Sequence, residues 1–169
     1  YMLKYIGAFE SEDGTNTMFL NKDRKNYIEN LNSGTRCHFR TLDDKARNVR
    51  GLTSSRVVVD EAQEVDVVTM ETSVLPLLTT TNGQLILIGT PGPERSGFMY
   101  QEILRIRSGK YYNGPNQPTA RIIDVDILRN PMAHPNKVQS VLARKSEPNI
   151  RREYFNEWGA GADKLFNPL

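Results

Sequence analysis

The sequence predicts an α/β fold with a mostly parallel sheet flanked by helices. Two short apolar runs, 57–59 and 85–89, have the β-branched and aliphatic composition of buried strands covered on both faces. A helix predicted over 66–78 separates them, and chains that alternate strands with helices form parallel pairs. A third strand is expected over 120–127, after an amphipathic helix over 98–106.

The other elements are shorter or lie near the ends. Apolar residues at helical spacing predict a helix over 24–31, and alternating residues predict a strand over 35–42. Two more helices are expected over 137–145 and 149–158. We expect a single incomplete domain over 1–158 and a linker over 159–169.

Composition narrows the class of protein. The 169 residues suffice for one domain with a core, and 38% hydrophobic and 25% charged residues are typical of a globular domain. No apolar stretch approaches the ~20 residues that span a bilayer, so we expect no membrane partner. The single cysteine, Cys37, excludes a disulfide within the chain. A net charge of +2 does not by itself favour nucleic acid.

Two adjacent carboxylates follow the first apolar run. Asp60 stands at the carboxyl end of the predicted strand, where ligands bind in parallel sheets, and a carboxylate there is suited to hold Mg²⁺. Glu61 is one residue further, in place to orient or deprotonate a water molecule. The alternative is that the pair caps the first turn of a following helix.

Thr90 ends the second apolar run in the same way. Its hydroxyl is expected at the carboxyl end of the neighbouring strand, close to the acid pair, where it is suited to sense a γ-phosphate. The alternative is an ordinary strand exit at a Thr-Pro turn.

Arg50 is the candidate cation. A guanidinium near a transferring phosphoryl group stabilises the charge of the transition state. Arg47 and Arg50 both precede the acid strand, and Gly51 after Arg50 permits tight backbone geometry. We therefore favour Arg50, while a solvated basic loop is the better interpretation of Arg47.

These segments together resemble the ATPase domain of the large terminase subunit of tailed bacteriophages. The similar segments are 49–53 (VRGLT), 57–63 (VVVDEAQ) and 88–91 (IGTP), followed by 129–131 and 151–158. The resemblance covers roughly residues 32–169. The acid motif alone is shared with helicases, so the ordered set is more specific than any of its members.

The resemblance implies a P-loop NTPase fold of the ASCE type and an ATP- and Mg²⁺-dependent motor that packages double-stranded viral DNA into procapsids. It assigns the Walker B aspartate to Asp60, the catalytic glutamate to Glu61, the coupling motif to Thr90 and an arginine that acts across a subunit boundary to Arg50. It also implies a homo-oligomeric ring, a portal protein and a small terminase subunit as partners. The implied location is the host cytoplasm and, transiently, the portal vertex of the procapsid.

The phosphate-binding half of such a site is missing from the sequence. The Walker A pattern G-x-x-x-x-G-K-(S/T) does not occur, and the only Gly-Lys pair, Gly109-Lys110, lacks the earlier glycine. We expect that this chain is part of a longer protein, and that alone it binds ATP very weakly and does not turn it over. The expected nuclease domain would follow the linker.

Two other functions stay open. A helicase-like, DNA-dependent ATPase carries a similar acid motif. A non-catalytic binding module that kept the sheet but lost the nucleotide is the third interpretation. The sequence upstream of Tyr1 would discriminate, because either ATPase needs a phosphate-binding loop.

Overall fold

The computed structural model describes residues 19–20, 27–29, 35–42, 49–111 and 119–159. The chain forms two compact units, Tyr1–Val49 and Arg50–Leu169. Every predicted site residue belongs to the second unit. The predicted boundary between residues 158 and 159 stays a prediction.

The first unit contains a three-stranded antiparallel sheet in the order β1-β2-β3, formed by β1 (Phe19–Leu20), β2 (Tyr27–Glu29) and β3 (Arg36–His38). The helix predicted over 24–31 is therefore wrong where the structure describes it. A short apolar run fits a strand as well as a helix, and here pairing with β3 decides. Tyr27 is buried, with its ring centroid 5.4 Å from that of His38.

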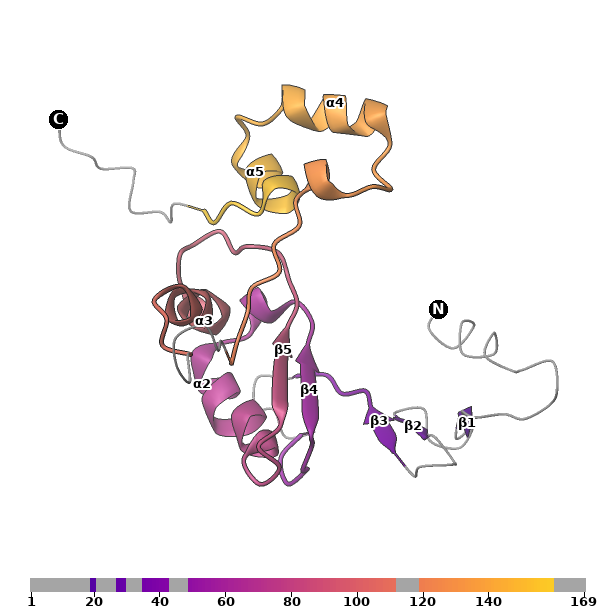
Figure 1. Cartoon of the computed structure of the whole chain (residues 1–169), viewed down its shortest axis with the longest axis vertical. Helices are drawn as coiled ribbons and strands as arrows, with labels where there is room; N and C mark the ends of the chain where they lie inside the picture. The colour runs from indigo at the N-terminus through magenta and orange to yellow at the C-terminus, as the bar shows by residue number, and fades with distance from the viewer. Residues whose placement is uncertain (1–18, 21–26, 30–34, 43–48, 112–118, 160–169) are drawn as a thin grey trace. The chain divides into compact units, whose positions relative to one another are not determined.

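The second unit is built on two parallel strands, β4 (Arg56–Val59) and β5 (Gln84–Leu87) (Figure 1). Val59 pairs with Leu87, so the two strands end together. The prediction of two parallel strands joined by a helical connection is confirmed. The prediction that both faces of the strand are covered is wrong for β4, because Val59 is buried whereas Val58 is 53% exposed.

The connection between the strands is one helical run with three hydrogen-bonding patterns. It begins as α2 (Val67–Thr69), widens into the π-turn η3 (Met70–Val74) and ends as the 3-10 segment η4 (Leu75–Leu78). The 3-10 segment begins one residue before Pro76, which has no N–H to donate and crowds the preceding turn. Asp66 caps the start by accepting a hydrogen bond of 2.8 Å from the N–H of Thr69.

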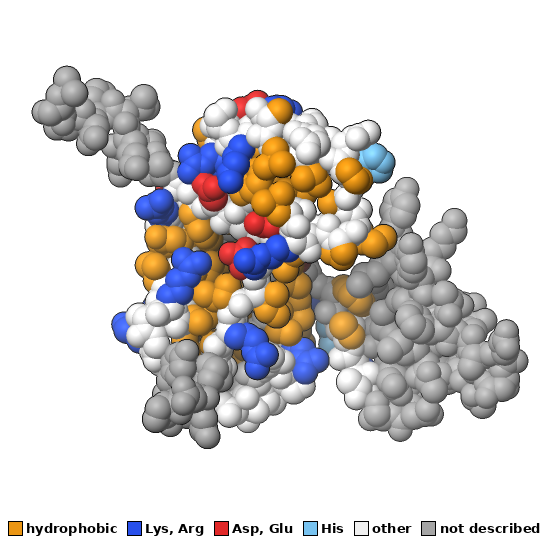
Figure 2. Space-filling model, turned by 45° about the horizontal axis from the view of Figure 1, so that its top comes forward, with side chains coloured by type: hydrophobic (Ala, Val, Ile, Leu, Met, Phe, Trp, Pro, Cys, Tyr) orange, Lys and Arg blue, Asp and Glu red, His pale blue; other side chains and the backbone are white. Residues whose placement is uncertain are grey.

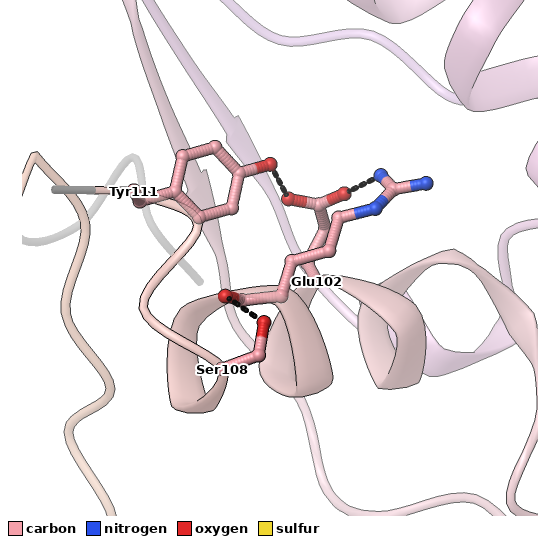
Figure 3. Close-up of polar contacts among 4 residues, drawn as sticks. Glu102, Ser108 and Tyr111 are labelled. Atoms are coloured by element: carbon pink, nitrogen blue, oxygen red, sulfur yellow. Dashed lines mark hydrogen bonds and ion pairs between the residues drawn. The ribbon is translucent and has the colours of Figure 1, made fainter.

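Helix α3 (Gly97–Arg107) follows β5 and packs against the short 3-10 turn η2 (Ala62–Glu64). Its carboxyl end is closed by side chains (Figure 3). Glu102 accepts hydrogen bonds from the hydroxyl of Tyr111 and the guanidinium of Arg105, while the hydroxyl of Ser108 donates to the carbonyl of Arg105 at 2.9 Å. Burial is the main cause that raises the pKa of Tyr111 above its ordinary value of 10.0, and the hydrogen bond to the Glu102 carboxylate is the second cause.

The third predicted strand is not present. Residues 120–126 form no strand or helix, and they lead into the 3-10 turn η5 (Ile127–Arg129), which Asp126 caps. Ile123 is 82% exposed, so its apolar character does not reflect burial in a sheet among the described residues. Composition predicted an extended backbone, but not whether a partner strand lies beside it.

Two helices, α4 (Pro135–Ala143) and α5 (Pro148–Phe155), confirm the last pair of predicted helices. Each begins with a proline, whose missing N–H costs nothing in the first turn. Cations over aromatic rings connect them: Lys137 lies 5.4 Å from the Tyr154 ring centroid and Lys145 lies 4.5 Å from that of Phe155.

The core of the second unit lies between the parallel strands and the helical connection, with Met70 and Val74 fully buried. Figure 2 shows Lys and Arg side chains in small groups among hydrophobic ones on one face. No helix in the described part of the chain is both long and apolar enough to cross a membrane. The architecture is a mixed α/β fold with a small parallel sheet and helices. Its buried hydrophobic residues are Val59, Ala62, Met70, Val74, Leu77, Leu78, Phe98, Val141 and Phe155.

Candidate functional site

The backbone ladder between β4 and β5 is interrupted at the acid pair. Ile88 donates its N–H to the carbonyl oxygen of Val59 at 2.9 Å, and its own carbonyl accepts from the N–H of Ala62 at 2.9 Å. In an unbroken parallel ladder that carbonyl would accept from Glu61. The strand thus accommodates one extra residue, as in a β-bulge. Asp60 and Glu61 leave the ladder at the carboxyl end of the sheet, where both are exposed.

The bulge places Glu61 in an unusual backbone conformation. Its φ of 49° and ψ of 44° lie in the left-handed region, and its N–H donates to Oδ1 of Asp60 at 3.1 Å. The other described non-glycine residues with positive φ are Asn82 and Asn156, a residue type that tolerates this region. A glutamate there costs roughly 1–3 kcal/mol, and such strain gathers at functional sites.

Gln63 connects the acid pair to the exit of β5. Its Nε2 donates to Oε2 of Glu61 at 2.7 Å. Its Oε1 is buried and has no hydrogen-bond partner among the described residues. The amide lies against Gly89, where an added Cβ atom would come within 2.0 Å of Oε1. A glycine at position 89 is therefore required for this packing.

Thr90 follows Gly89 directly at the exit of β5, and its placement beside the acid pair stays a prediction. It is half-buried, whereas Pro91 and Gly92 after it are buried. Trp158 packs against the next turn, because a Cβ added to Gly92 would lie 3.2 Å from its ring. The exit of β5 therefore packs against Gln63 at Gly89 and against the segment after α5 at Gly92.

Arg50 is not part of this group. It precedes β4, whereas Asp60 follows it, and four strand residues span roughly 13 Å. Its Nε donates to the Ser73 hydroxyl at 3.4 Å, a long hydrogen bond. Arg50 lines a shallow pocket of about 270 Å³ beside the helical connection. The residues that line this pocket are Arg50, Gly51, Leu52, Thr72, Ser73, Pro76 and Leu77.

The acid pair fits one half of a magnesium-nucleotide site. Among the described residues, no three His, Cys, Asp or Glu side chains gather to hold a metal ion. Mg²⁺ is usually held by one or two carboxylates together with substrate phosphates and water, and Asp60 meets that need. No phosphate cradle accompanies it, since the sequence lacks the glycine-rich loop with its lysine.

No role was predicted for Gln63 or Gly89 from the sequence, although they lie within the segments 57–63 and 88–91. A usable signal existed for Gly89, because glycine at a strand end often marks close approach of another group. Gln63 gave no such signal. Its role depends on the bulge, which turns the chain back so that its side chain meets Glu61.

Comparison with known proteins supports the fold alone. No protein-family model matches the chain, and no curated protein matches it in sequence. Among solved structures, the large terminase ATPase domain of Thermus phage P74-26 is similar, with a TM-score of 0.50 and 19% sequence identity. The match covers 83% of this chain and 62% of that domain. In its fold, therefore, the chain is similar to a phage terminase ATPase domain.

Proposed function

We propose that this chain supplies the acidic half of an ATPase site of the large-terminase type, which drives double-stranded DNA into a procapsid. The observation that carries the proposal is the bulge, which displaces Asp60 and Glu61 from the ladder beside the exit of β5. The fold similarity to a phage terminase ATPase domain supports it. The phosphate-binding loop would come from another segment of the full-length protein.

Within the site, the residues have separate roles. Asp60 would hold Mg²⁺ directly or through water, and the ion would neutralise charge on the nucleotide phosphates. Glu61 would accept a hydrogen bond from the attacking water and orient it. Thr90, at the exit of β5, would respond to the phosphate and pass its state to the loop that Trp158 covers.

Arg50 would act on another subunit. It precedes β4, whereas the acid pair follows it, and its Nε donates to Ser73 on the helical connection, so we assign it to the site of a neighbouring subunit. An exposed guanidinium beside a shallow pocket suits a role at a boundary between subunits of a homo-oligomeric ring.

The decisive experiment measures ATP hydrolysis by the full-length protein. Glu61→Gln should lower kcat by roughly 10²- to 10⁴-fold, because it removes the water-orienting carboxylate, while leaving binding of a fluorescent ATP analogue within about twofold. Glu64→Gln, at an exposed neighbouring acid, is the matched control. Unchanged turnover in Glu61→Gln would refute the proposed role and favour the non-catalytic module.

Two further measurements separate the alternatives. The 169-residue chain alone should show no micromolar binding of the fluorescent nucleotide and no magnesium-dependent turnover. In the full-length protein, stimulation of turnover by procapsids and double-stranded DNA supports a packaging motor. Stimulation by single-stranded nucleic acid without procapsids would favour the helicase-like ATPase.

A further inference from the structure

We propose that Gln63 is a positioning residue, which holds the Glu61 carboxylate and connects it to the backbone at the exit of β5. The inference rests on the proposed function of Glu61. In this arrangement the amide of Gln63 sets where the carboxylate lies, and Gly89 sets where the amide lies.

The direction of the amide follows from charge. Nε2 donates to Oε2 of Glu61 at 2.7 Å. The reversed amide would turn its carbonyl oxygen toward the carboxylate, so that two acceptors would face each other. The ionised glutamate therefore selects one orientation of Gln63, and Gln63 in turn restricts the rotamers of Glu61.

The position of the amide depends on Gly89. The buried Oε1 occupies the space that a side chain at position 89 would fill, 2.0 Å from where its Cβ would be. The Ala62 N–H that closes the bulge donates to Ile88, the residue before Gly89. Any shift of this part of the β5 exit toward η2 displaces the amide, and the carboxylate with it.

Stability alone does not explain a glutamine at this position. Its buried Oε1 has no hydrogen-bond partner among the described residues, which costs free energy that an apolar side chain of similar size would not incur. The amide is accounted for by its hydrogen bond to Glu61. Gln63→Leu therefore separates the two explanations, because leucine fills similar space without a donor.

The first experiment measures ATP turnover and thermal unfolding of the full-length protein. Gln63→Leu should lower kcat by about 10-fold or more, with the KM for ATP within about twofold, while Tm stays equal or rises. Gly89→Ala should lower kcat in the same way by displacing the amide. Glu64→Ala, an exposed neighbour in the same turn, is the control and should keep wild-type values.

The second experiment observes the contact without catalysis. In the 169-residue chain at constant pH, the side-chain ¹⁵N–¹H signals of Gln63 should shift in Glu61→Ala and stay in place in Glu64→Ala. This measurement does not depend on whether the protein hydrolyses ATP.

The outcomes distinguish the inference from the function beneath it. If Glu61→Gln abolishes turnover but Gln63→Leu retains the wild-type kcat, the positioning role is wrong and the proposed function stands. Gln63 signals that stay in place in Glu61→Ala would overturn the positioning role as well. If the wild-type protein hydrolyses no ATP, both fall, whatever the signals show.

Discussion

The backbone N–H of Gly159 donates to the carbonyl oxygen of Gly92, 3.1 Å away. This hydrogen bond ties the segment that leaves α5 to the loop that leaves β5. Beside it, the ring of Trp158 lies 4.9 Å from that of Tyr100 on α3, measured between centroids. The loop that leaves β5 is thus joined to residues far later in the sequence.

The first prediction concerns Gly159→Ala. A Cβ there would lie 1.8 Å from the carbonyl oxygen of Pro93, which is backbone and cannot rotate away. The substitution should cost about 1–3 kcal/mol of unfolding free energy and release Trp158 from its contact. Because Trp158 is the single tryptophan, a red shift of its fluorescence reports that release.

Gly51→Ala is the comparison for this prediction. Gly51 has a φ of 78° but nothing within 4 Å of an added Cβ, so its cost reflects backbone conformation without a clash. The tryptophan fluorescence of Gly51→Ala should match that of the wild type. Equal spectra for both variants would contradict the contact between Trp158 and the β5 loop.

The second prediction concerns Arg50→Ala. Its hydrogen bond to Ser73 is long, at 3.4 Å, and contributes little, so the free energy of unfolding should change by less than about 0.5 kcal/mol. Turnover by the assembled full-length protein should nevertheless fall by roughly 10³-fold if the guanidinium acts across a subunit boundary. Circular dichroism melts and ATPase rates measure the two quantities.

Mixed assemblies identify where Arg50 acts. Rings formed from Arg50→Ala and Glu61→Gln subunits contain boundaries at which an intact arginine meets an intact glutamate, so activity should be partly restored. Arg50 and Glu61 acting within one chain would instead leave every site defective, and the mixture would be as inactive as its components.

The third prediction concerns the cap of the helical connection. Hydrogen bonds from Thr69 hold the pKa of Asp66 below its ordinary value of 3.8. The ionised cap therefore stabilises the fold above about pH 4, and this contribution is lost as pH falls through the folded-state pKa. Asp66→Asn keeps a capping oxygen but does not titrate.

Thermal unfolding between pH 6 and pH 2 checks this prediction. The difference in Tm between the wild type and Asp66→Asn should narrow as the pH falls below about 4. A constant difference for Asp66→Asn would contradict the lowered pKa.

The fourth prediction concerns Tyr111→Phe. The substitution removes the hydrogen bond to Glu102 and should cost about 1 kcal/mol, since the tyrosine is only partly buried. The raised pKa means that the unfolded chain loses the phenolic proton first. Wild-type stability should therefore fall faster than that of Tyr111→Phe as pH rises above about 10. Denaturant unfolding at pH 7 to 11 measures both effects.

The first sheet shows where sequence reasoning failed. Tyr27, Ile28 and Leu31 are apolar at helical spacing, but pairing with residues 36–38 makes 27–29 a strand. The segment 119–126 failed in the opposite sense, because its composition favours extended backbone but no neighbouring strand pairs with it among the described residues. In both cases the presence or absence of a partner strand decides, and the local sequence does not record it.

The sequence by itself determined the two parallel strands and the helical run between them. Those features follow from local hydrophobic runs and from the geometry that a helical crossover imposes on parallel strands. Only the tertiary structure decided the bulge at Ala62, the left-handed Glu61 and the amide of Gln63 over Gly89. Each feature depends on which backbone N–H donates to the carbonyl of Ile88. That hydrogen bond joins residues far apart in the chain, so no local sequence pattern predicts it.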